Sequence, residues 1–235
     1  MTNSIVDSSA KIGRNVNIGH FAVIEANVVI GDNVTVGNNV TIHEGTTIGD
    51  NCYIESNAVL GRKPRPAKTS TVKFTSTLPA LKLGEGTTVG VGAVLYAGSI
   101  FGSDVMVGDL ASVREKCNIS NNVVIGRGVA IENQVEIGEF TKIQTNAYIT
   151  AYTTLEDYVF IAPMVTTTND NYMGRGEERF KYIKGPTVKK GSRVGGASVL
   201  CPGITIAAET FVAAGAVVTK DTAEGSKVKG VPAKG

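Results

Sequence analysis

An aliphatic residue returns at every sixth position along most of this chain. The first run extends from Val6 to Leu60, the second from Leu83 to Ile161, and the third from Val188 to Val218. These runs hold ten, fourteen and six repeats, thirty in all. Because Val, Ile and Leu fill only 57 of the 235 positions, chance does not produce a period this regular.

A six-residue period fits short strands and not helices. An α-helix would carry such a repeat around its whole surface and form no apolar face. Gly, Asn and Asp, which tolerate turn geometry, lie between the aliphatic positions, as in Gly31-Asp32-Asn33, and Gly directly follows the aliphatic residue in thirteen repeats. The pattern predicts a parallel β-solenoid in which like residues stack around an apolar interior.

Composition restricts the compartment and the partners. The formal charge is +2, from 23 basic and 21 acidic residues, which indicates no nucleic-acid surface and no polybasic membrane anchor. No apolar stretch reaches the roughly 18 residues of a membrane-spanning helix, and no secretory leader follows Met1, so we expect a cytoplasmic protein. Three cysteines at positions 52, 117 and 201 predict neither a disulfide framework nor a zinc site, and Cys52 and Cys117 are expected to be small inward-facing fillers.

Two stretches interrupt the period, at residues 61–82 and 167–187, and we expect both to form surface insertions. The first has no acidic residue and predicts a site for an anion such as phosphate, although a solvated loop would have the same composition. The second contains Asn169, Asp170 and Tyr172 followed by charges of both signs, so a subunit interface and an active-site loop remain open for it. The basic residues of the first insertion are Arg62, Lys63, Arg65, Lys68, Lys73 and Lys82.

The hexad pattern resembles the hexapeptide-repeat proteins, in which three hexads form one triangular coil of a left-handed parallel β-helix. The resemblance covers nearly the whole chain. It implies an all-β, single-domain fold over residues 1–235, with about ten coils and the two insertions. It also implies a homotrimer with ligand sites between adjacent prisms.

The C-terminal coils resemble those of acyl-CoA-dependent hexapeptide acyltransferases, on the segments Val194-Gly-Gly-Ala-Ser, Ala213-Ala-Gly-Ala and Gly230-Val-Pro-Ala-Lys. The resemblance implies that small residues hold the pantetheine arm of acetyl-CoA or another acyl-CoA and that lysines meet its phosphates. Gly and Ala would also serve tight coil packing alone. The candidate coenzyme residues are Gly195, Gly196, Ala214, Gly215, Lys220, Pro232 and Lys234.

Only two histidines, His20 and His43, limit the chemistry. The γ-class carbonic anhydrases share this fold but need three His ligands, so that class is excluded and we expect no metal. A hydroxyl acceptor would need a His base, for which His43 is the better candidate. An amine attacks a thioester once it has lost one proton, so a carboxylate suffices. The residues that point to amine chemistry are Asp109 and Glu115, with Arg114 between them; a solvated turn carboxylate or an ion pair is the structural alternative.

Counting along the repeat places some of these residues together. If the first insertion leaves at one corner, Leu60, Leu95, Val113 and Ile131 stack on one face, and Glu115 then lies one coil from Asn133. We expect Asp109 or Glu115 to accept the proton of the amine, with Asn133 in the same site.

Four segments resemble bacterial N-acyltransferases that act on nucleotide-linked amino sugars: Val107-Gly-Asp-Leu-Ala-Ser-Val-Arg-Glu-Lys, Ile131-Glu-Asn, Ile143-Gln-Thr-Asn-Ala-Tyr-Ile-Thr and Thr166-Thr-Thr-Asn-Asp-Asn-Tyr-Met-Gly-Arg. The resemblance implies an acyl-CoA-dependent N-acyltransferase acting on a nucleotide-activated deoxyamino sugar. An O-acetyltransferase that uses His43 and a non-catalytic β-solenoid scaffold are the alternatives. The expected substrate contacts are Arg62, Lys63, Arg65, Lys73, Arg114, Asn169, Asp170 and Tyr172.

Overall fold

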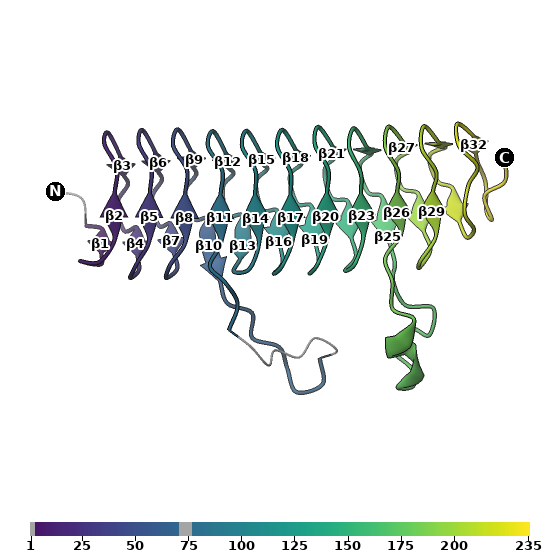
Figure 1. The fold of residues 1–235 in the computed structure, drawn as a ribbon, viewed down its shortest axis with the longest axis horizontal. Helices are drawn as coiled ribbons and strands as arrows, with labels where there is room; N and C mark the ends of the chain where they lie inside the picture. Colours follow the sequence, from purple (N-terminus) through teal and green to yellow (C-terminus); the bar gives the residue numbers. More distant parts are fainter. Residues whose placement is uncertain (1–2, 71–76) are drawn as a thin grey trace.

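The computed structural model, which describes residues 3–70 and 77–235, is a three-sided parallel β-prism with a left-handed turn (Figure 1). Most strands are two residues long, and each pairs in parallel with the strand of the next coil, as Ile119 does with Ile137. Three successive strands form one coil and contribute one strand to each of three sheets, which we call A, B and C.

Sheet A contains β1 (Ile5–Val6), β4 (Val23–Ile24), β7 (Thr41–Ile42), β10 (Val59–Arg62), β13 (Val94–Tyr96), β16 (Ser112–Val113), β19 (Ala130–Ile131), β22 (Tyr148–Ile149), β25 (Thr166–Thr167), β28 (Val199–Leu200) and β31 (Val217–Val218). Sheet B contains β2 (Lys11–Ile12), β5 (Val29–Ile30), β8 (Thr47–Ile48), β11 (Lys82–Leu83), β14 (Ile100–Phe101), β17 (Asn118–Ile119), β20 (Glu136–Ile137), β23 (Thr154–Leu155), β26 (Thr187–Val188) and β29 (Thr205–Ile206). Sheet C contains β3 (Asn17–Ile18), β6 (Thr35–Val36), β9 (Tyr53–Ile54), β12 (Thr88–Val89), β15 (Met106–Val107), β18 (Val124–Ile125), β21 (Lys142–Ile143), β24 (Phe160–Ile161), β27 (Arg193–Val194), β30 (Phe211–Val212) and β32 (Lys227–Val228).

The aliphatic residue of each repeat points into the prism and forms its core. Ile42, Leu60 and Ile125 are fully buried, and the same holds along most of the column. Cys52 and Cys117 lie in this core as the predicted fillers, and burial raises the pKa of the Cys117 thiol to about 12. A thiol with so high a pKa stays protonated at neutral pH, which agrees with a packing role.

All thirty predicted repeats are strands, but the expectation of about ten coils was low by one. Sheets A and C each have eleven strands and sheet B has ten. The two further strands are β25 and β32. At β25 the inward residue is Thr167, whose hydroxyl accepts a hydrogen bond from the N–H of Thr150 at 2.7 Å, so a search for aliphatic residues misses it. At β32 the inward Val228 follows Val218 by ten positions and breaks the period.

Both insertions leave sheet A and return to sheet B, so they project from the same edge of the prism (Figure 1). We call this edge the A–B corner. The first insertion is narrower than residues 61–82, because β10 continues to Arg62 and β11 begins at Lys82. The second contains a short 3-10 helix, η1 (Glu178–Lys181). Within the described residues, no helix has the length and apolarity that crossing a membrane requires.

Glycine distinguishes the A–B corner from the other two corners. Of the thirteen glycines that directly follow an inward aliphatic residue, twelve follow strands of sheets B and C. Where glycine occupies this position, the coils pack too closely for a side chain, since a Cβ on Gly108 would lie 2.6 Å from the backbone nitrogen of Arg127. The A–B corner has only Gly61 in this position, and its other coils carry side chains there. The A–B corner therefore carries the most continuous column of side chains on the prism.

The close packing at the glycine corners gives the first testable prediction. Gly108→Ala places a methyl group against the backbone of the next coil and should lower the free energy of unfolding by about 1–3 kcal/mol. Gln144→Ala is the matched control, because Gln144 occupies the same position two coils later and already has a side chain. Urea denaturation followed by circular dichroism measures both. Equal midpoints for the two variants would contradict this account of the corners.

Candidate functional site

One column of side chains at the A–B corner contains most of the candidate chemistry. Its members directly follow the inward residue of successive sheet A strands, and neighbours are about 4.8 Å apart except where an insertion intervenes. From the second coil to the ninth the column consists of Glu25, His43, Gly61, Tyr96, Arg114, Glu132, Thr150 and Thr168.

A pocket of about 290 Å³ lies over this column between the two insertions, and we call it the central pocket. Sheet A and its corner supply Arg114, Glu132, Asn133, Tyr148 and Thr150. The first insertion contributes Ser70, and the second contributes Asn169, Asp170, Arg179, Phe180 and Ile183. The pocket thus joins segments that are far apart in the sequence, and its lining is mainly polar.

Arg114 holds two carboxylates at the edge of this pocket. Its Nε and Nη2 donate to Glu115 at 2.8 and 2.9 Å, and its Nη1 donates to Glu132 Oε2 at 3.3 Å. Although burial opposes the charged guanidinium, the hydrogen bonds to Glu115 and the two negative charges raise the pKa of Arg114 overall. Glu115 is only 1% exposed, whereas 28% of the Glu132 side chain is exposed. Glu115 is therefore bound to Arg114, and Glu132 is the carboxylate that faces the pocket.

The remaining lining groups can hydrogen-bond a polyhydroxylated ligand. Burial, and then the negative charge of Glu132, raise the pKa of Tyr148, so its phenol stays protonated and can donate. Asn133 is 3% exposed and donates from Nδ2 to Gln134 Oε1 at 3.3 Å. Together these residues offer a hydroxyl, an amide and a carboxylate within one small space.

The Asp170 side chain organises the second insertion by accepting hydrogen bonds from other residues of the same insertion. It accepts hydrogen bonds from the N–H groups of Gly174 at 2.9 Å and Tyr172 at 2.8 Å, and from Arg179 Nη1 at 2.7 Å. These bonds, that of Gly174 first, hold the pKa of Asp170 below its ordinary value. Tyr172 stacks on Tyr182 with ring centres 5.9 Å apart and does not line the central pocket. Of the predicted contacts in this insertion, Asn169 and Asp170 reach the pocket.

The structure separates the two predicted carboxylates. Asp109 lies at the corner between sheets C and A, where its Oδ1 accepts the N–H of Val91 at 2.9 Å. Asp157 makes the same bond to the N–H of Glu139, so this contact is a repeated turn cap. Glu115 and Asn133 lie one coil apart, as predicted, because Val113 pairs with Ile131. Asp109 is not among the residues that line the central pocket.

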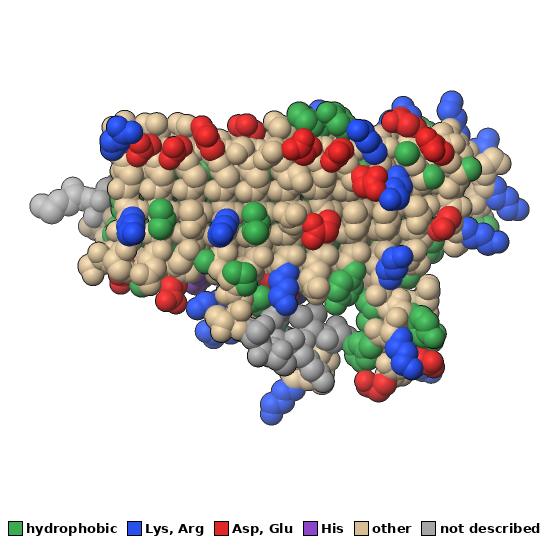
Figure 2. Space-filling model, in the orientation of Figure 1, with side chains coloured by type: hydrophobic (Ala, Val, Ile, Leu, Met, Phe, Trp, Pro, Cys, Tyr) green, Lys and Arg blue, Asp and Glu red, His purple; other side chains and the backbone are tan. Residues whose placement is uncertain are grey.

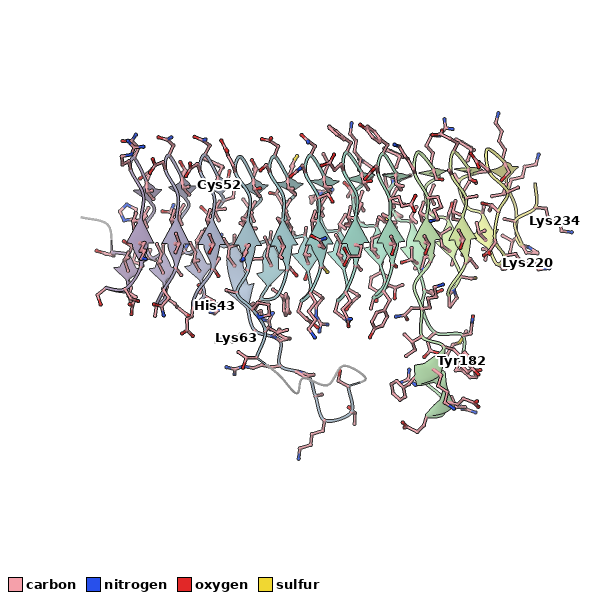
Figure 3. The ribbon with its side chains drawn as sticks, in the orientation of Figure 1. His43, Cys52, Lys63, Tyr182, Lys220 and Lys234 are labelled. Carbon is pink, nitrogen blue, oxygen red and sulfur yellow. The ribbon has the colours of Figure 1, made fainter. Side chains whose placement is uncertain are left out.

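The basic residues of the first insertion line a different pocket. Arg62, Lys63 and Arg65 surround a concavity of about 560 Å³ together with His43 and Glu25, and we call it the N-terminal pocket. Basic side chains and a histidine gather at the root of this insertion in Figure 2, and Figure 3 shows His43 beside Lys63. The predicted contact Lys73 lies outside the described residues.

Tyr96 separates the two pockets. The Arg62 guanidinium lies 5.3 Å from the centre of its ring, and the Arg114 guanidinium lies 5.4 Å from it. One arginine from each pocket therefore contacts the same ring.

The candidate coenzyme residues lie at the C-terminal end of the prism. Gly195, Gly196, Ala214 and Gly215 form turns between sheets C and A. A Cβ on Gly195 would lie 2.5 Å from the nitrogen of Ala214, so coil packing alone explains this glycine, whereas Gly215 faces open space. Lys220, Pro232 and Lys234 are exposed at the end of the chain, where Figure 3 shows both lysines.

A pocket of about 640 Å³ on the outer face of sheet C extends from Gly195 and was not predicted. Its lining includes the rings of Phe160 and Phe211, and the Arg193 guanidinium lies 5.9 Å from the ring centre of Phe211. Aromatic faces and cations suit the adenine and phosphates of a nucleotide. The sequence signal is an alternation of basic and aromatic residues at the outward positions of sheet C: Lys142, Phe160, Arg193, Phe211 and Lys227.

Among residues 3–70 and 77–235, no three His, Cys, Asp or Glu side chains are grouped so that they could hold a metal ion.

The comparisons with known proteins agree on the architecture. The bacterial transferase hexapeptide family (six repeats) matches residues 9–44 and 27–62. No curated protein sequence matches this chain significantly. The family match thus covers residues 9–62, and the chain as a whole has the left-handed β-helix fold.

Solved structures of acyltransferases share this fold. The UDP-N-acetylglucosamine acyltransferase LpxA from Bacteroides fragilis 9343 has 23% sequence identity and a TM-score of 0.63 over 73% of this chain and 74% of that one. The UDP-N-acetylglucosamine acyltransferase from Arabidopsis has 17% identity and a TM-score of 0.58 over 97% of this chain and 70% of that one.

The Arg114 network gives the second prediction. Arg114→Met leaves the buried Glu115 carboxylate without its partner and should lower the free energy of unfolding by about 3–5 kcal/mol. The double variant with Glu115→Gln removes that charge and should recover much of the loss. Chemical denaturation at pH 7 gives the unfolding free energies of wild type, the two single variants Arg114→Met and Glu115→Gln, and the double variant. Additive losses in the double variant would show that the pair does not act as a unit.

Proposed function

We propose that this protein is an acyltransferase that moves an acyl group from a coenzyme A thioester to the amine of a nucleotide-activated deoxyamino sugar. The observation that carries the proposal is the Glu132 carboxylate, which faces a small polar pocket between the two insertions. The shared fold of acyltransferases and the match to the transferase hexapeptide family support group transfer. The acyl donor follows from the resemblance of the C-terminal coils.

In the proposed mechanism Glu132 binds the ammonium group of the sugar and accepts one of its protons. The neutral amine then attacks the thioester carbonyl, a C–N bond forms and the C–S bond breaks, and the leaving sulfur takes up a proton. Arg114 Nη1 donates to Glu132 Oε2 at 3.3 Å and so fixes the position of the carboxylate that receives the substrate. Tyr148 and Asn133 are placed to donate hydrogen bonds to the sugar or to the developing oxyanion.

In this proposal one chain alone does not bring the coenzyme residues close to the central pocket. Within one prism the turns of Gly195 and Ala214 and the A–B corner lie at opposite edges of sheet A. We therefore propose a homotrimer in which the C-terminal coils of one copy approach the A–B corner of the next. Arg62, Lys63 and Arg65 hold the diphosphate of the nucleotide, and Lys220 and Lys234 hold the phosphates of the coenzyme.

The outer face of sheet A supports self-association because none of its outward positions is charged. A flat uncharged face can be buried without leaving an unpaired charge, whereas sheets B and C carry outward Lys, Arg or Glu side chains. The outward positions of sheet A are Ile5, Val23, Thr41, Val59, Val94, Ser112, Ala130, Tyr148, Thr166, Val199 and Val217.

The catalytic assignment is tested with acetyl-CoA and a panel of nucleotide-linked amino sugars, by mass spectrometry of the acylated product. Glu132→Gln removes the proton acceptor and should lower kcat about a hundredfold or more. Glu136→Gln, on the outer face of sheet B, is the matched control, and Asp109→Asn tests the carboxylate at the other corner. Both should keep kcat within about twofold of wild type. Full activity in Glu132→Gln would remove this residue from the mechanism.

The assembly is tested by sedimentation. Wild type should sediment as a species with three times the 24.5 kDa chain mass. Val199→Lys places a charge on the outer face of sheet A and should dissociate it, because each buried lysine would lack a partner. Thr205→Lys makes the same change on sheet B in the same coil and should leave the assembly intact. A monomeric wild type, or dissociation by Thr205→Lys alone, would refute this interface.

A further inference from the structure

The N-terminal pocket has the composition of an anion site. It lies over the second to fifth coils, between the outer face of sheet A and the root of the first insertion. Val59 and Val94 form an apolar floor, and Arg62, Lys63 and Arg65 surround it. Among the described residues, Lys63 is paired with Glu44 at 3.4 Å, whereas Arg62 and Arg65 have no ion pair. The pocket therefore carries an excess of positive charge.

His43 is held in one orientation at the edge of this pocket. Its Nδ1 lies 3.1 Å from Glu25 Oε1, and the other carboxylate oxygen of Glu25 accepts the backbone N–H of Glu44 at 3.0 Å. A carboxylate fixed in this way accepts a hydrogen bond from Nδ1–H, and a ring that carries both protons then has Nε2–H to donate to a ligand. The imidazole is 29% exposed, so a molecule in the pocket can reach it.

Gly61 packs closely on the coil below it, and this contact sets the position of Arg62, the first basic residue of the insertion. Gly61 has a left-handed backbone with a φ of +77°, and a Cβ there would lie 3.3 Å from His43 Cβ and would meet Thr46 Oγ1. That hydroxyl is buried and has no hydrogen-bond partner in the part of the chain that the structure describes. The first insertion thus leaves the prism directly over His43, and Arg62 follows at the pocket.

We propose that the N-terminal pocket binds the diphosphate of a nucleotide and that His43, oriented by Glu25, is a phosphate ligand. The nature of the ligand rests on the proposed function, because the amine in the central pocket and the diphosphate would lie on the two sides of Tyr96. Phosphate oxygens accept from guanidinium, ammonium and imidazolium groups, and the valine floor accommodates the nucleoside.

Distance argues against a role for His43 as the base for this amine. His43 belongs to the third coil and Glu132 to the seventh, and four coil spacings amount to about 19 Å. A general base must lie within hydrogen-bond reach of the proton that it removes. His43 is thus a binding residue for the substrate that Glu132 deprotonates.

The test measures binding of inorganic pyrophosphate by isothermal titration calorimetry, with no acyl donor present. His43→Gln should weaken binding about tenfold, the size of one charge-assisted hydrogen bond. Glu25→Gln keeps the shape of the orienting side chain and should weaken binding by a smaller factor, about threefold. Lys11→Ala is the control, because it removes a positive charge from sheet B in the first coil and should leave the affinity unchanged.

Pyrophosphate affinity that is unchanged in both His43→Gln and Glu25→Gln would overturn the proposal. An equal loss of pyrophosphate affinity in His43→Gln and in Lys11→Ala would also overturn it, because that result would mean that only the overall charge of the protein matters. If wild type binds pyrophosphate with this dependence on His43 but transfers no acyl group, the proposed function fails and the phosphate site stands. A kcat that collapses in His43→Gln while pyrophosphate affinity is kept would instead make His43 a base.

Discussion

The stacking of one coil on the next constrains everything else in this protein. Coils that stack about 4.8 Å apart leave no space for a side chain directly after the inward residue where the chain turns sharply. Glycine occupies that position in most coils at two of the corners, and Gly138 shows why, since a Cβ there would lie 2.5 Å from the nitrogen of Asp157. At the A–B corner side chains occupy it instead, and both insertions leave from this corner. One edge of the prism therefore collects the functional groups while the other two close the coils.

Arg114 contacts two carboxylates, Glu115 and Glu132, which differ in burial and in their proposed roles. Glu115 is enclosed and takes both arms of the guanidinium fork, so it compensates a partly buried charge. Glu132 receives one longer contact and keeps its face to the pocket. The same cation that binds the buried Glu115 thus also positions the group proposed to react. Tyr96 extends this arrangement to the N-terminal pocket, because arginines from both pockets contact its ring.

The sequence predicts the strands well because burial in a solenoid depends on position within the repeat. It fails where the inward residue is polar, as at Thr167, or where the period shifts, as before Val228. The alignment of Glu115 with Asn133 follows from counting, and Glu132 could have been found by noting which corner lacks glycine. Counting does not show that Arg114 forms an ion pair with Glu115, or that Asp109 caps a turn, because both contacts depend on side-chain direction. The second insertion hides the basic and aromatic alternation of sheet C by breaking the count between Phe160 and Arg193.

The central claim is that the reactive carboxylate and the amine of the acceptor meet at the A–B corner. A crystal structure with a nucleotide-linked amino sugar tests it most directly. The account predicts the amine nitrogen within about 3.2 Å of a Glu132 oxygen, in the pocket between the two insertions. Density for the sugar at another corner of the prism, with Glu132 in contact only with Arg114, would contradict it.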